Sequence, residues 1–597
     1  MKWRDLMCGE PRADRVGERL TLAGWAARRR DHGGLVFIDL RDHTGICQLV
    51  INPERSPEAA PVAHQVRNEF VLRAEGELVP RAPDAVNPAL PTGEVELQVD
   101  SLEIVSRSEP LPFQLDEEGV DELTRIRYRY LDLRRDHMQQ NLRISHTIGA
   151  AIRRSMEEQG FIDVWTPSMT KGTPEGARDF LVPVRLQPGT FFALAQSPQV
   201  FKQLFMIGGL DRYYQIATCW RDEDLRADRQ FEFRQLDFEL AFPTREDVLD
   251  VMERVVRASF EAVGREPPSL PLRRVSYDDV MARYGTDKPD VRFGLEIEDA
   301  TEVTRDSEFG VFGNAPAVGF IRVPQEFSRT ELGSLEEVAK EWGAKGLAYL
   351  VYDEEGEVRS PIAKFLSERE LATFRSDPAT TVLFAADELP IVRRVLGGLR
   401  THLGRELGLI DPRRDELLWV VDFPLFQHDE ESGNWTFMHH PFTAPLPGHE
   451  GLVEGEPANA LSQHYDLVWN GWELGSGSIR IHDSDVQAAV FRTMGMSAEE
   501  AEEKFGYLLE ALRMGAPPHG GFALGLERFV ALLADERNIR EIVAFPKVSS
   551  GSDPLTGAPT PLPDEQLREL GIRVVEGNGI LGRERSVRDG DTGTRSS

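Results

Sequence analysis

Cysteine is scarce in this sequence. The 597 residues include three cysteines, Cys8, Cys47 and Cys219, which lie far apart. No two of them have the spacing of a metal-binding pair, and an odd number in so long a chain does not suggest a disulfide framework. We therefore expect reduced thiols, and neither a cysteine metal site nor a small disulfide-stabilised fold.

Long apolar runs are also missing. The N-terminal stretch MKWRDLMCGE lacks the apolar segment of a signal peptide. No stretch reaches the ~18–20 apolar residues that a membrane span needs. These two absences predict a cytoplasmic protein that makes no contact with a membrane.

Positive charge is in deficit. The chain has 69 Lys and Arg residues against 100 Asp and Glu residues, a net charge of −31. A nucleic-acid binder usually shows a basic footprint. Net charge describes solubility and long-range steering and says nothing about a local patch, so this balance does not exclude RNA.

The length of the chain and the order of its strand-like and helix-like segments predict an α+β protein of several domains. Residues 1–106 read as five short strands, Leu20–Trp25, Leu35–Leu40, Ile46–Ile51, Glu69–Glu75 and Glu94–Ile104, with the ~8–12-residue spacing of a small barrel. Residues 107–135 read as a hinge that leads into a helix. We expect two halves of one domain at 136–285 and 421–555, an α+β insertion at 286–420, and a C-terminal extension with a disordered end at 556–597.

The first segment that carries chemistry is RDEDLRADRQFEF, Arg221–Phe233. The apolar runs Tyr213–Trp220 and Phe233–Ala241 flank it, so the segment is predicted to be the loop of an antiparallel hairpin. Arginines on a rigid strand suit a polyanion, because guanidinium groups bind phosphate in a planar, bidentate way. The alternative is an ordinary solvated hairpin tip.

The second segment is GGFALGLER, Gly520–Arg528. Its glycines precede a helix pattern that has an arginine in the first turn. Glycine lets backbone approach a ligand, and a helix start together with an arginine favours an anion. The alternative is a glycine-rich packing turn between a strand and a helix.

The third segment is VWNGWELGSGSIRIH, Val468–His482. In a regular strand Glu473 and Arg480 face opposite sides, so a bulge is needed to bring them together. Asp466 precedes Glu473, and two carboxylates near phosphate oxygens suit Mg²⁺. The alternative is a glycine-rich strand packed closely against another backbone.

Three shorter segments complete the set. FIDVWTPSMT, Phe161–Thr170, reads as a strand with Pro167 at an edge or interface. TPEGARDF at 173–180 reads as a loop that could cover a pocket. ALAQSPQVFKQLF at 193–205 reads as a helix start at Ser197, with Lys202 facing a ligand. Alone, the first segment is better explained as an ordinary edge strand and Lys202 as a solvated lysine, and the alternative for TPEGARDF is a plain surface loop.

In this order the segments resemble the three signature motifs of the class II aminoacyl-tRNA synthetases. The segment around Pro167 resembles the first motif, Arg221–Glu223 with Arg229 and Phe233 the second, and Gly525–Arg528 the third. TPEGARDF, QSPQVFKQ, RDEDLRADRQ, MHHPF and GSGSIRIH together resemble the bacterial-type aspartate enzymes of this class. The resemblance runs from about residue 1 to 573. No HIGH-like or KMSKS-like sequence supports class I.

The resemblance implies an OB-type anticodon-binding barrel, a six-stranded antiparallel catalytic sheet, a bacterial-type insertion domain and a homodimer. It implies that Arg221 and Arg528 act in catalysis. The implied ATP ligands are Arg221, Asp222, Glu223, Gln230, Glu473, Gly525, Leu526, Glu527 and Arg528. The implied aspartate ligands are Glu175, Gln199, Lys202, Arg221, Asp237, His439 and Arg480. Asp466 and Glu473 would hold the Mg²⁺ that accompanies ATP.

Within the site, Arg480 and Lys202 would select the substrate side chain, since fixed cations reject a neutral amide. Asp237 and Glu175 would suit the substrate ammonium. His439 and His440 could instead be a metal pair, although adjacent histidines on a strand point apart.

On the barrel, the resemblance implies that Arg28, Arg30, Phe37 and Gln48 bind the anticodon, by stacking and by contacts along the backbone. The alternative is that Phe37 belongs to the core and that the arginines, including Arg29, are solvated. His32, where many tRNA(Asp)-only enzymes have Leu, and the loop APDAVN without its Lys resemble the non-discriminating form. That form also charges tRNA(Asn), which links it to a tRNA-dependent amidotransferase.

Other readings remain open. The asparagine or lysine enzyme of the same subclass would differ in its amino-acid pocket. A non-catalytic RNA-binding paralogue would usually lack the two ATP-binding arginines. A tRNA-independent asparagine synthetase on the same catalytic fold would lack the barrel.

Overall fold

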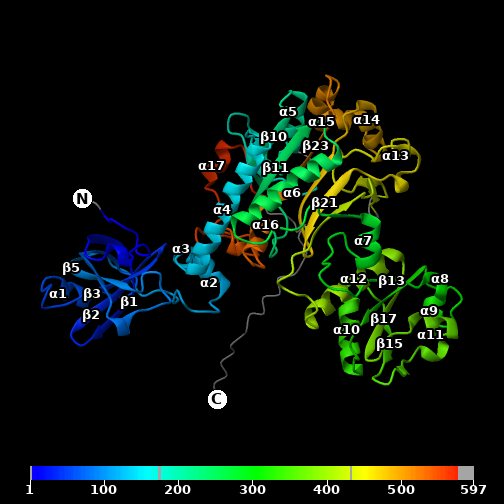
Figure 1. Ribbon diagram of the computed structural model, residues 1–597. Helices are drawn as coiled ribbons and strands as arrows, with labels where there is room; N and C mark the ends of the chain where they lie inside the picture. The colour runs from blue at the N-terminus through cyan, green and yellow to red at the C-terminus, as the bar shows by residue number, and fades with distance from the viewer. Residues whose placement is uncertain (1–2, 173–175, 430–432, 576–597) are drawn as a thin grey trace, which may run out of the picture.

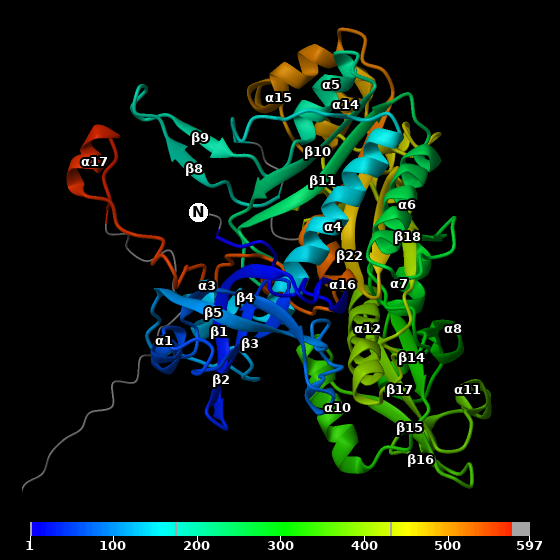
Figure 2. The same cartoon turned by 60° about the vertical axis from the view of Figure 1, so that its left-hand side comes forward.

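The computed structural model describes residues 3–172, 176–429 and 433–575. A closed barrel (blue) and a second α+β unit (green) both extend from a central domain that is built on a large sheet (Figure 1). Figure 2 shows the same arrangement from another side. The α+β multidomain architecture expected from the sequence is confirmed. None of the helices in the described part of the chain has the length and apolarity that a membrane crossing requires.

The N-terminal barrel closes in the strand order β1-β2-β3-β5-β4. Its elements are β1 (Arg19–His32), β2 (Leu35–Asp42), β3 (Gly45–Ile51), α1 (Ala59–Gln65), β4 (Val71–Pro80) and β5 (Val95–Ser106). Gly33 and Gly34 form the turn of the first hairpin with φ of 59° and 84°, a conformation that glycine adopts at little cost. The five predicted strands are present, and β1 extends seven residues beyond Trp25 to His32.

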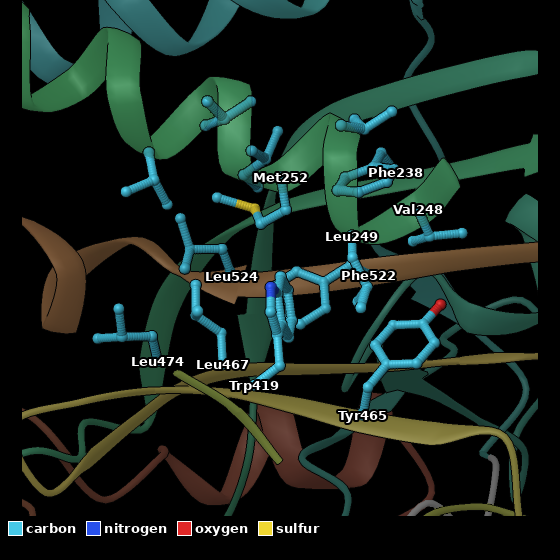
Figure 3. Close-up of a cluster of buried hydrophobic side chains, with 14 of the residues drawn as sticks. Phe238, Val248, Leu249, Met252, Trp419, Tyr465, Leu467, Leu474, Phe522 and Leu524 are labelled. Atoms are coloured by element: carbon cyan, nitrogen blue, oxygen red, sulfur yellow. The ribbon is translucent and has the colours of Figure 1, made fainter. Parts of the chain in front are cut away.

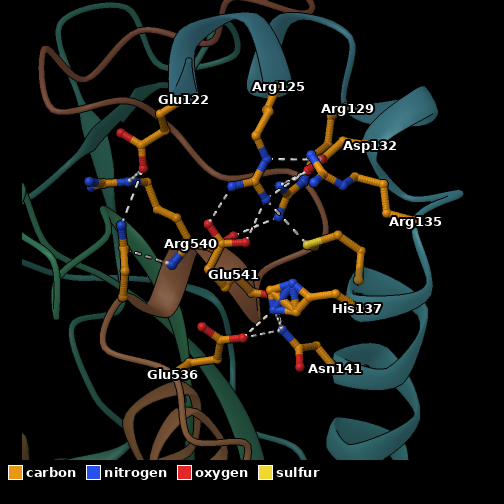
Figure 4. Close-up of polar contacts among 12 residues, drawn as sticks. Glu122, Arg125, Arg129, Asp132, Arg135, His137, Asn141, Glu536, Arg540 and Glu541 are labelled. Atoms are coloured by element: carbon orange, nitrogen blue, oxygen red, sulfur yellow. Dashed lines mark hydrogen bonds and ion pairs between the residues drawn. The ribbon is translucent and has the colours of Figure 1, made fainter. Parts of the chain in front are cut away.

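The hinge folds into two short helices, α2 (Glu122–Arg127) and α3 (Arg129–Asp132), ahead of the long α4 (Asp136–Glu158). The predicted helix therefore begins earlier than Ile144. Arg125 donates hydrogen bonds to both carboxylate oxygens of Glu541, at 3.0 and 2.6 Å, and Arg129 is buried beside Asp132 (Figure 4). These contacts fix the hinge to the end of the central domain.

The central sheet has the order β12-β18-β21-β22-β23-β11-β10-β6. Its strands are β12 (Arg273–Ser276), β18 (Leu417–Val421), β21 (His464–Trp469), β22 (Trp472–Ile479), β23 (His519–Gly525), β11 (Glu232–Ala241), β10 (Arg212–Trp220) and β6 (Ile162–Asp163). The six strands from β18 to β10 are antiparallel, as expected. The two edge strands β12 and β6 pair in parallel and lie outside the expected six, and β6 falls within the strand predicted at Phe161–Thr170.

The two faces of this sheet differ in chemistry. On β11, Leu236, Phe238 and Leu240 belong to the apolar core, while Asp237 and Glu239 point the other way, because side chains alternate along a strand. Most of the helical side chains in the core come from α4, α6 (Arg245–Ala262) and α16 (Leu526–Leu533). Figure 3 shows this core. Each fully buried large apolar side chain contributes about 1.5–3 kcal/mol.

The segment Phe161–Thr170 is not one strand, so that prediction was wrong. β6 pairs with β10, whereas β7 (Met169–Thr170) joins a separate sheet with β9 (Phe191–Leu194) and β8 (Leu181–Pro183). Trp165, between β6 and β7, is 84% exposed. The helix α5 (Gln199–Ile207) starts two residues later than Ser197.

The α+β unit has a five-stranded antiparallel sheet in the order β13-β14-β17-β15-β16. These strands are β13 (Glu298–Asp299), β14 (Ala317–Val323), β17 (Thr380–Asp387), β15 (Ala348–Tyr352) and β16 (Val358–Arg359). Its longer helices are α10 (Arg329–Glu341) and α12 (Leu389–Glu406), and α7 (Tyr277–Tyr284) precedes it. The unit lies within the predicted insertion at 286–420.

The other helices and strands of two residues or more are α8 (Thr301–Thr304), α9 (Gly310–Gly313), α11 (Glu368–Phe374), β19 (Phe426–His428), β20 (Trp435–Phe437), α13 (Leu452–Gly455), α14 (Ser484–Thr493), α15 (Ala498–Leu512) and α17 (Asp564–Glu569).

Candidate active site

A cavity of about 360 Å³ lies on the polar face of the central sheet. The predicted site residues that line it are Gln199, Lys202, Arg221, Glu223, Gln230, Asp237, His439, Asp466, Glu473, Arg480, Gly525, Glu527 and Arg528. Asp222 and Leu526 do not line it, and Leu526 packs in the apolar core. Glu175 lies outside the described residues. The four cations on which the prediction depends therefore share one cavity.

Arg480 and Lys202 are both held by buried carboxylates. Arg480 donates to the two oxygens of Glu239, at 2.9 and 3.1 Å. Lys202 donates to Asp237 at 2.8 Å and lies 3.4 Å from Glu239. The two positive charges are therefore balanced by two buried negative charges.

Gly521 on β23 makes the Arg480–Glu239 pair possible. β23 lies between β22 and β11, so the two side chains must meet across it. A Cβ at Gly521 would lie 2.1 Å from a carboxylate oxygen of Glu239, closer than any real contact. Gly521 therefore makes room for an ion pair, while Gly525 of the same segment lines the cavity.

The pKa values of the two buried carboxylates are shifted in opposite directions. Burial raises the pKa of Asp237, and Lys202 offsets only part of this effect. Burial also opposes ionisation of Glu239, but Arg480 and Lys202 together hold the pKa of Glu239 below its ordinary value. Asp237 Oδ1 is buried without a hydrogen-bond partner among the described residues. This oxygen is free to accept a hydrogen bond from a cationic ligand.

Three histidines gather beside the ion pairs. The rings of His439 and His464 stack 4.2 Å apart, and His440 lies 4.2 Å from His439. Arg480 Nη1 is 2.6 Å from His440 Nε2. Burial and the neighbouring cationic side chains hold the pKa values of His439 and His440 well below their ordinary value. The two histidines do not point apart as predicted, because residues 438–439 form a bend and not a strand.

Arg221 and Arg528 are a second pair of cations in the lining. The Arg221 guanidinium stands over the ring of Phe233, 5.0 Å from its centroid. Arg528 donates to the carbonyl oxygens of Asp228 and Glu473, both at 3.1 Å. Arg221 has no hydrogen bond or ion pair to any side chain that the structure describes. Its charge is therefore available to an anion.

Glu473 reaches the cavity through a bulge in β22. Leu467 pairs with Gly475 and Val468 pairs with Glu473, so Leu474 is the extra residue. The bulge reverses the alternation, which confirms the prediction that one is required to bring Glu473 and Arg480 to one face. Burial and the charge of Asp466 raise the pKa of Glu473. A cation between these two carboxylates would relieve that repulsion.

No cluster of three or more His, Cys, Asp or Glu side chains in the described ranges could by itself hold a metal ion. Asp466 and Glu473 supply two carboxylates. Mg²⁺ commonly takes one or two carboxylates and completes its shell with water and substrate phosphates. The donor set therefore fits a Mg²⁺ ion that arrives with a nucleotide.

Two predicted ATP ligands also have structural partners. Gln230 Oε1 accepts from the Lys547 backbone N–H at 2.8 Å, and its amide nitrogen donates to the Lys547 carbonyl. Glu527 accepts from the backbone and side chain of Arg234 at 3.0 and 2.8 Å. Both residues line the cavity, but in this state their polar groups hold the surrounding segments in place.

The barrel has a polar patch on its outer surface. Arg30 pairs with Phe37 in the β1–β2 register, and Phe37 lies outside the core, which excludes the alternative that it is a core residue. Gln48 accepts from Arg30 at 3.2 Å and donates to Glu96 at 2.7 Å. Arg28 is exposed on the same strand. His32 is exposed at the end of β1.

Sequence comparison identifies the family. The family described as "tRNA synthetases class II (D, K and N)" matches residues 121–549. The chain belongs to this family. The description "OB-fold nucleic acid binding domain" matches residues 20–105, which are the barrel strands. The chain is therefore an aminoacyl-tRNA synthetase with an N-terminal OB barrel.

Similar proteins are aspartate enzymes by name. The chain is 49% identical to "Aspartate--tRNA ligase" of Geobacillus kaustophilus (strain HTA426), over 96% of this chain and 99% of the relative. It is 48% identical to "Aspartate--tRNA(Asp/Asn) ligase" of Mycobacterium avium (strain 104), over 96% and 98%. The solved asparaginyl-tRNA synthetase of Pyrococcus horikoshii with asparaginyl-adenylate gives a TM-score of 0.58 at 19% identity, covering 91% of this chain and 97% of that one, which supports the fold alone.

Sequence reasoning missed several lining or partner residues. Glu239 holds both Lys202 and Arg480, and its place two residues after Asp237 on the same strand was a usable signal. His440 was considered only as half of a metal pair. His464 and Asp287 line the cavity from segments that no motif marked, and only the tertiary structure brings them there.

Proposed function

We propose that this synthetase is an aspartate–tRNA ligase, which activates L-aspartate with ATP and transfers it to the 3′ end of tRNA. One observation carries the proposal. Arg221 and Arg528 face the same cavity as Lys202 and Arg480, so cations for phosphate lie beside cations for a dicarboxylic acid. The names of the similar proteins agree with this substrate.

Activation needs no protein nucleophile. The aspartate α-carboxylate attacks the α-phosphate in line, and pyrophosphate leaves. Arg221 and Arg528 stabilise the charge on the phosphate, so positioning and electrostatics supply the catalysis. Phe233 offers a ring face to the adenine. In the second step the terminal ribose hydroxyl of tRNA attacks the adenylate.

Asp466 and Glu473 would hold Mg²⁺. When bound, the ion neutralises phosphate oxygens and removes the repulsion that raises the pKa of Glu473.

The aspartate subsite is built from the buried ion pairs. The ammonium of the substrate fits Asp237 Oδ1, which has no other partner among the described side chains. The side-chain carboxylate fits the remaining N–H of Lys202 and the one on Arg480 Nη2 that is not given to Glu239. Arg480 Nη1 already contacts Ser478 and His440, each at 2.6 Å. His439 and Gln199 border the same space. Asparagine would present an NH₂ group to these donors, and a site built for hydrogen bonds rejects such a mismatch strongly.

The barrel patch of Arg28, Arg30, Phe37 and Gln48 would bind the anticodon by base stacking and charge. We also propose that tRNA(Asn) is charged, because His32 replaces Leu and because similar proteins carry the Asp/Asn name. A tRNA-dependent amidotransferase would then convert the product. A tRNA(Asp)-only enzyme is the second candidate, and the name of another similar protein favours it.

We propose a homodimer whose interface includes the exposed residues around the first motif. Trp165 is 84% exposed, and Ile162 and Met169 are 52% and 51% exposed. Large exposed apolar side chains of this kind mark interaction surfaces. Sedimentation equilibrium should give twice the chain mass of 67.2 kDa, and a monomer at micromolar concentration would contradict the dimer.

The decisive experiment is ATP–pyrophosphate exchange with aspartate, asparagine and lysine, followed by charging of purified tRNA(Asp) and tRNA(Asn). Exchange that depends on aspartate alone is expected. Exchange with asparagine or lysine instead would refute the substrate, and no exchange with any of the three would indicate a non-catalytic paralogue. Failure to charge tRNA(Asn) would leave the tRNA(Asp)-only enzyme.

A further inference from the structure

The segment Thr286–Asp290 touches the nucleotide end of the cavity, although no motif assigned it a role. Asp287 lines the cavity. Lys288 Nζ lies 3.8 Å from Glu473 Oε2, and the Lys288 side chain is 47% exposed. This ammonium donates no hydrogen bond to any residue in the described ranges. A charge with three unused donors therefore stands beside the proposed Mg²⁺ ligand.

The ion pair itself does not explain why a lysine is placed here. An exposed pair at this distance contributes little to stability, about 0–1 kcal/mol. Arg528 approaches Glu473 from another side and donates to its carbonyl oxygen at 3.1 Å. The ammonium of Lys288 lies 3.8 Å from Glu473 on a half-exposed side chain, so it can turn from Glu473 toward the negative charge of a triphosphate.

The segment Thr286–Asp290, the turn of Lys288, is held in place from two sides. The buried guanidinium of Arg400, on α12 of the insertion unit, donates to the carbonyl oxygens of Asp290, Phe293 and Gly294 at 2.8, 2.9 and 3.1 Å. From the catalytic side, a Cβ at Gly471, in the turn between β21 and β22, would lie 3.3 Å from Asp290. The insertion unit thus fixes the position of a segment of the active site.

The α7–α12 contact adds to this rigidity. Gly285 ends α7 with φ of 68°, and a Cβ there would lie 2.1 Å from the Arg393 carbonyl oxygen. A Cβ at Gly397 on α12 would lie 2.7 Å from the Tyr284 carbonyl oxygen. The two backbones touch directly, immediately before the turn begins.

We propose that Lys288 binds the pyrophosphate portion of ATP and that Arg400 is a positioning residue which holds the turn of Lys288 in place. The inference rests on the proposed function, because it takes ATP as the ligand of this cavity. It gives the insertion unit a role in nucleotide binding. A lysine suits this role, since its ammonium is a point charge on a flexible stem that can move from Glu473 to a phosphate.

The test compares Lys288→Met, Lys288→Arg and the control Lys345→Met. Lys345 is on the insertion unit and pairs with Asp387 at 2.7 Å, and Asp387, unlike Glu473, does not line the cavity. We measure ATP KM and aspartate KM in pyrophosphate exchange, ATP Kd by equilibrium dialysis, and thermal unfolding. For Lys288→Met, ATP KM and Kd should rise about ten-fold or more, as loss of a charge-assisted phosphate contact predicts. Aspartate KM should change by less than about two-fold, and Lys345→Met and Lys288→Arg should stay near wild type.

The role of Arg400 is tested by non-additivity. Arg400→Lys should raise ATP KM, but in the double variant with Lys288→Met it should add nothing further, because both changes act on one contact. Additive effects would overturn the positioning role.

ATP KM and Kd of Lys288→Met within about two-fold of wild type would overturn the inference, since a lost phosphate contact costs more than this. An equal rise in aspartate KM or early unfolding would show a structural role and also overturn it. A wild-type protein that binds ATP but exchanges no pyrophosphate with aspartate would instead refute the proposed function. The dialysis measurement separates that failure from a failure of the Lys288 inference.

Discussion

Replacing Glu239 by Gln tests the physics of the buried ion pairs most directly. Glu239 is 0% exposed and accepts hydrogen bonds from Nε and Nη2 of Arg480. Gln keeps the shape of the side chain but removes the charge, and its NH₂ group faces an N–H donor of Arg480. Removal of one partner from a buried pair costs about 3–5 kcal/mol, because the other charge stays buried without compensation. We expect a loss of that size in the free energy of unfolding.

The matched control is Asp250→Asn on the surface of α6. Asp250 pairs with Arg254 at 2.8 Å, and their side chains are 57% and 60% exposed. The control should lose no more than about 1 kcal/mol. Urea unfolding followed by tryptophan fluorescence measures both variants, since the buried Trp419 and Trp469 report on the core behind β11.

The effect of pH gives the prediction a sign. Arg480 and Lys202 hold the pKa of Glu239 in the folded protein below the ordinary value of 4.5. The advantage of wild type over Glu239→Gln should therefore be complete above pH 4.5 and disappear as the pH falls through the lowered folded value. If Glu239→Gln loses no more stability at neutral pH than the surface control, the pair contributes no more than an exposed one and the reasoning is wrong.

Three further predictions concern single residues. Arg528→Lys should raise ATP KM about ten-fold, since Lys cannot reproduce the forked contacts of the guanidinium, and an unchanged KM in pyrophosphate exchange would remove Arg528 from the nucleotide site. His440→Asn should reduce the loss of stability below pH 6.5, because the unfolded chain takes up a proton that buried His440 refuses. Below pH 6.5, the slope of the unfolding free energy against pH should fall by about 1.4 kcal/mol per pH unit, as measured by urea titrations. An unchanged slope would contradict the lowered pKa of His440. His32→Leu should lower charging of tRNA(Asn) more than charging of tRNA(Asp), and an equal effect on both tRNAs would rule His32 out as the discriminating residue.

Some errors in the sequence analysis have a common cause. The segment Phe161–Thr170 has strand-like composition, but β6 and β7 join different sheets, and Trp165 lies exposed between them. His439 and His440 were treated as neighbours on a strand, and a bend brings their rings together instead. Local pattern indicates what a residue prefers, whereas the partners of a segment determine whether the preference is realised.

Sequence alone determined the parts of this protein that depend on local periodicity and residue chemistry. The five barrel strands, the β10–β11 hairpin and the need for a bulge in β22 follow from alternation, which is a property of the chain itself. The ordered motifs likewise marked Arg221, Arg480 and Arg528 as site residues.

Only the tertiary structure decided what those charges meet. Arg480 pairs with Glu239 because β23 places a glycine between β22 and β11, and the two residues are 241 positions apart in the chain. The turn of Lys288 reaches Glu473 because Arg400 on α12, more than 100 positions away in the chain, holds it there. Such pairings depend on strand order and packing between distant segments, and the energy of a buried charge depends on which partner that packing supplies.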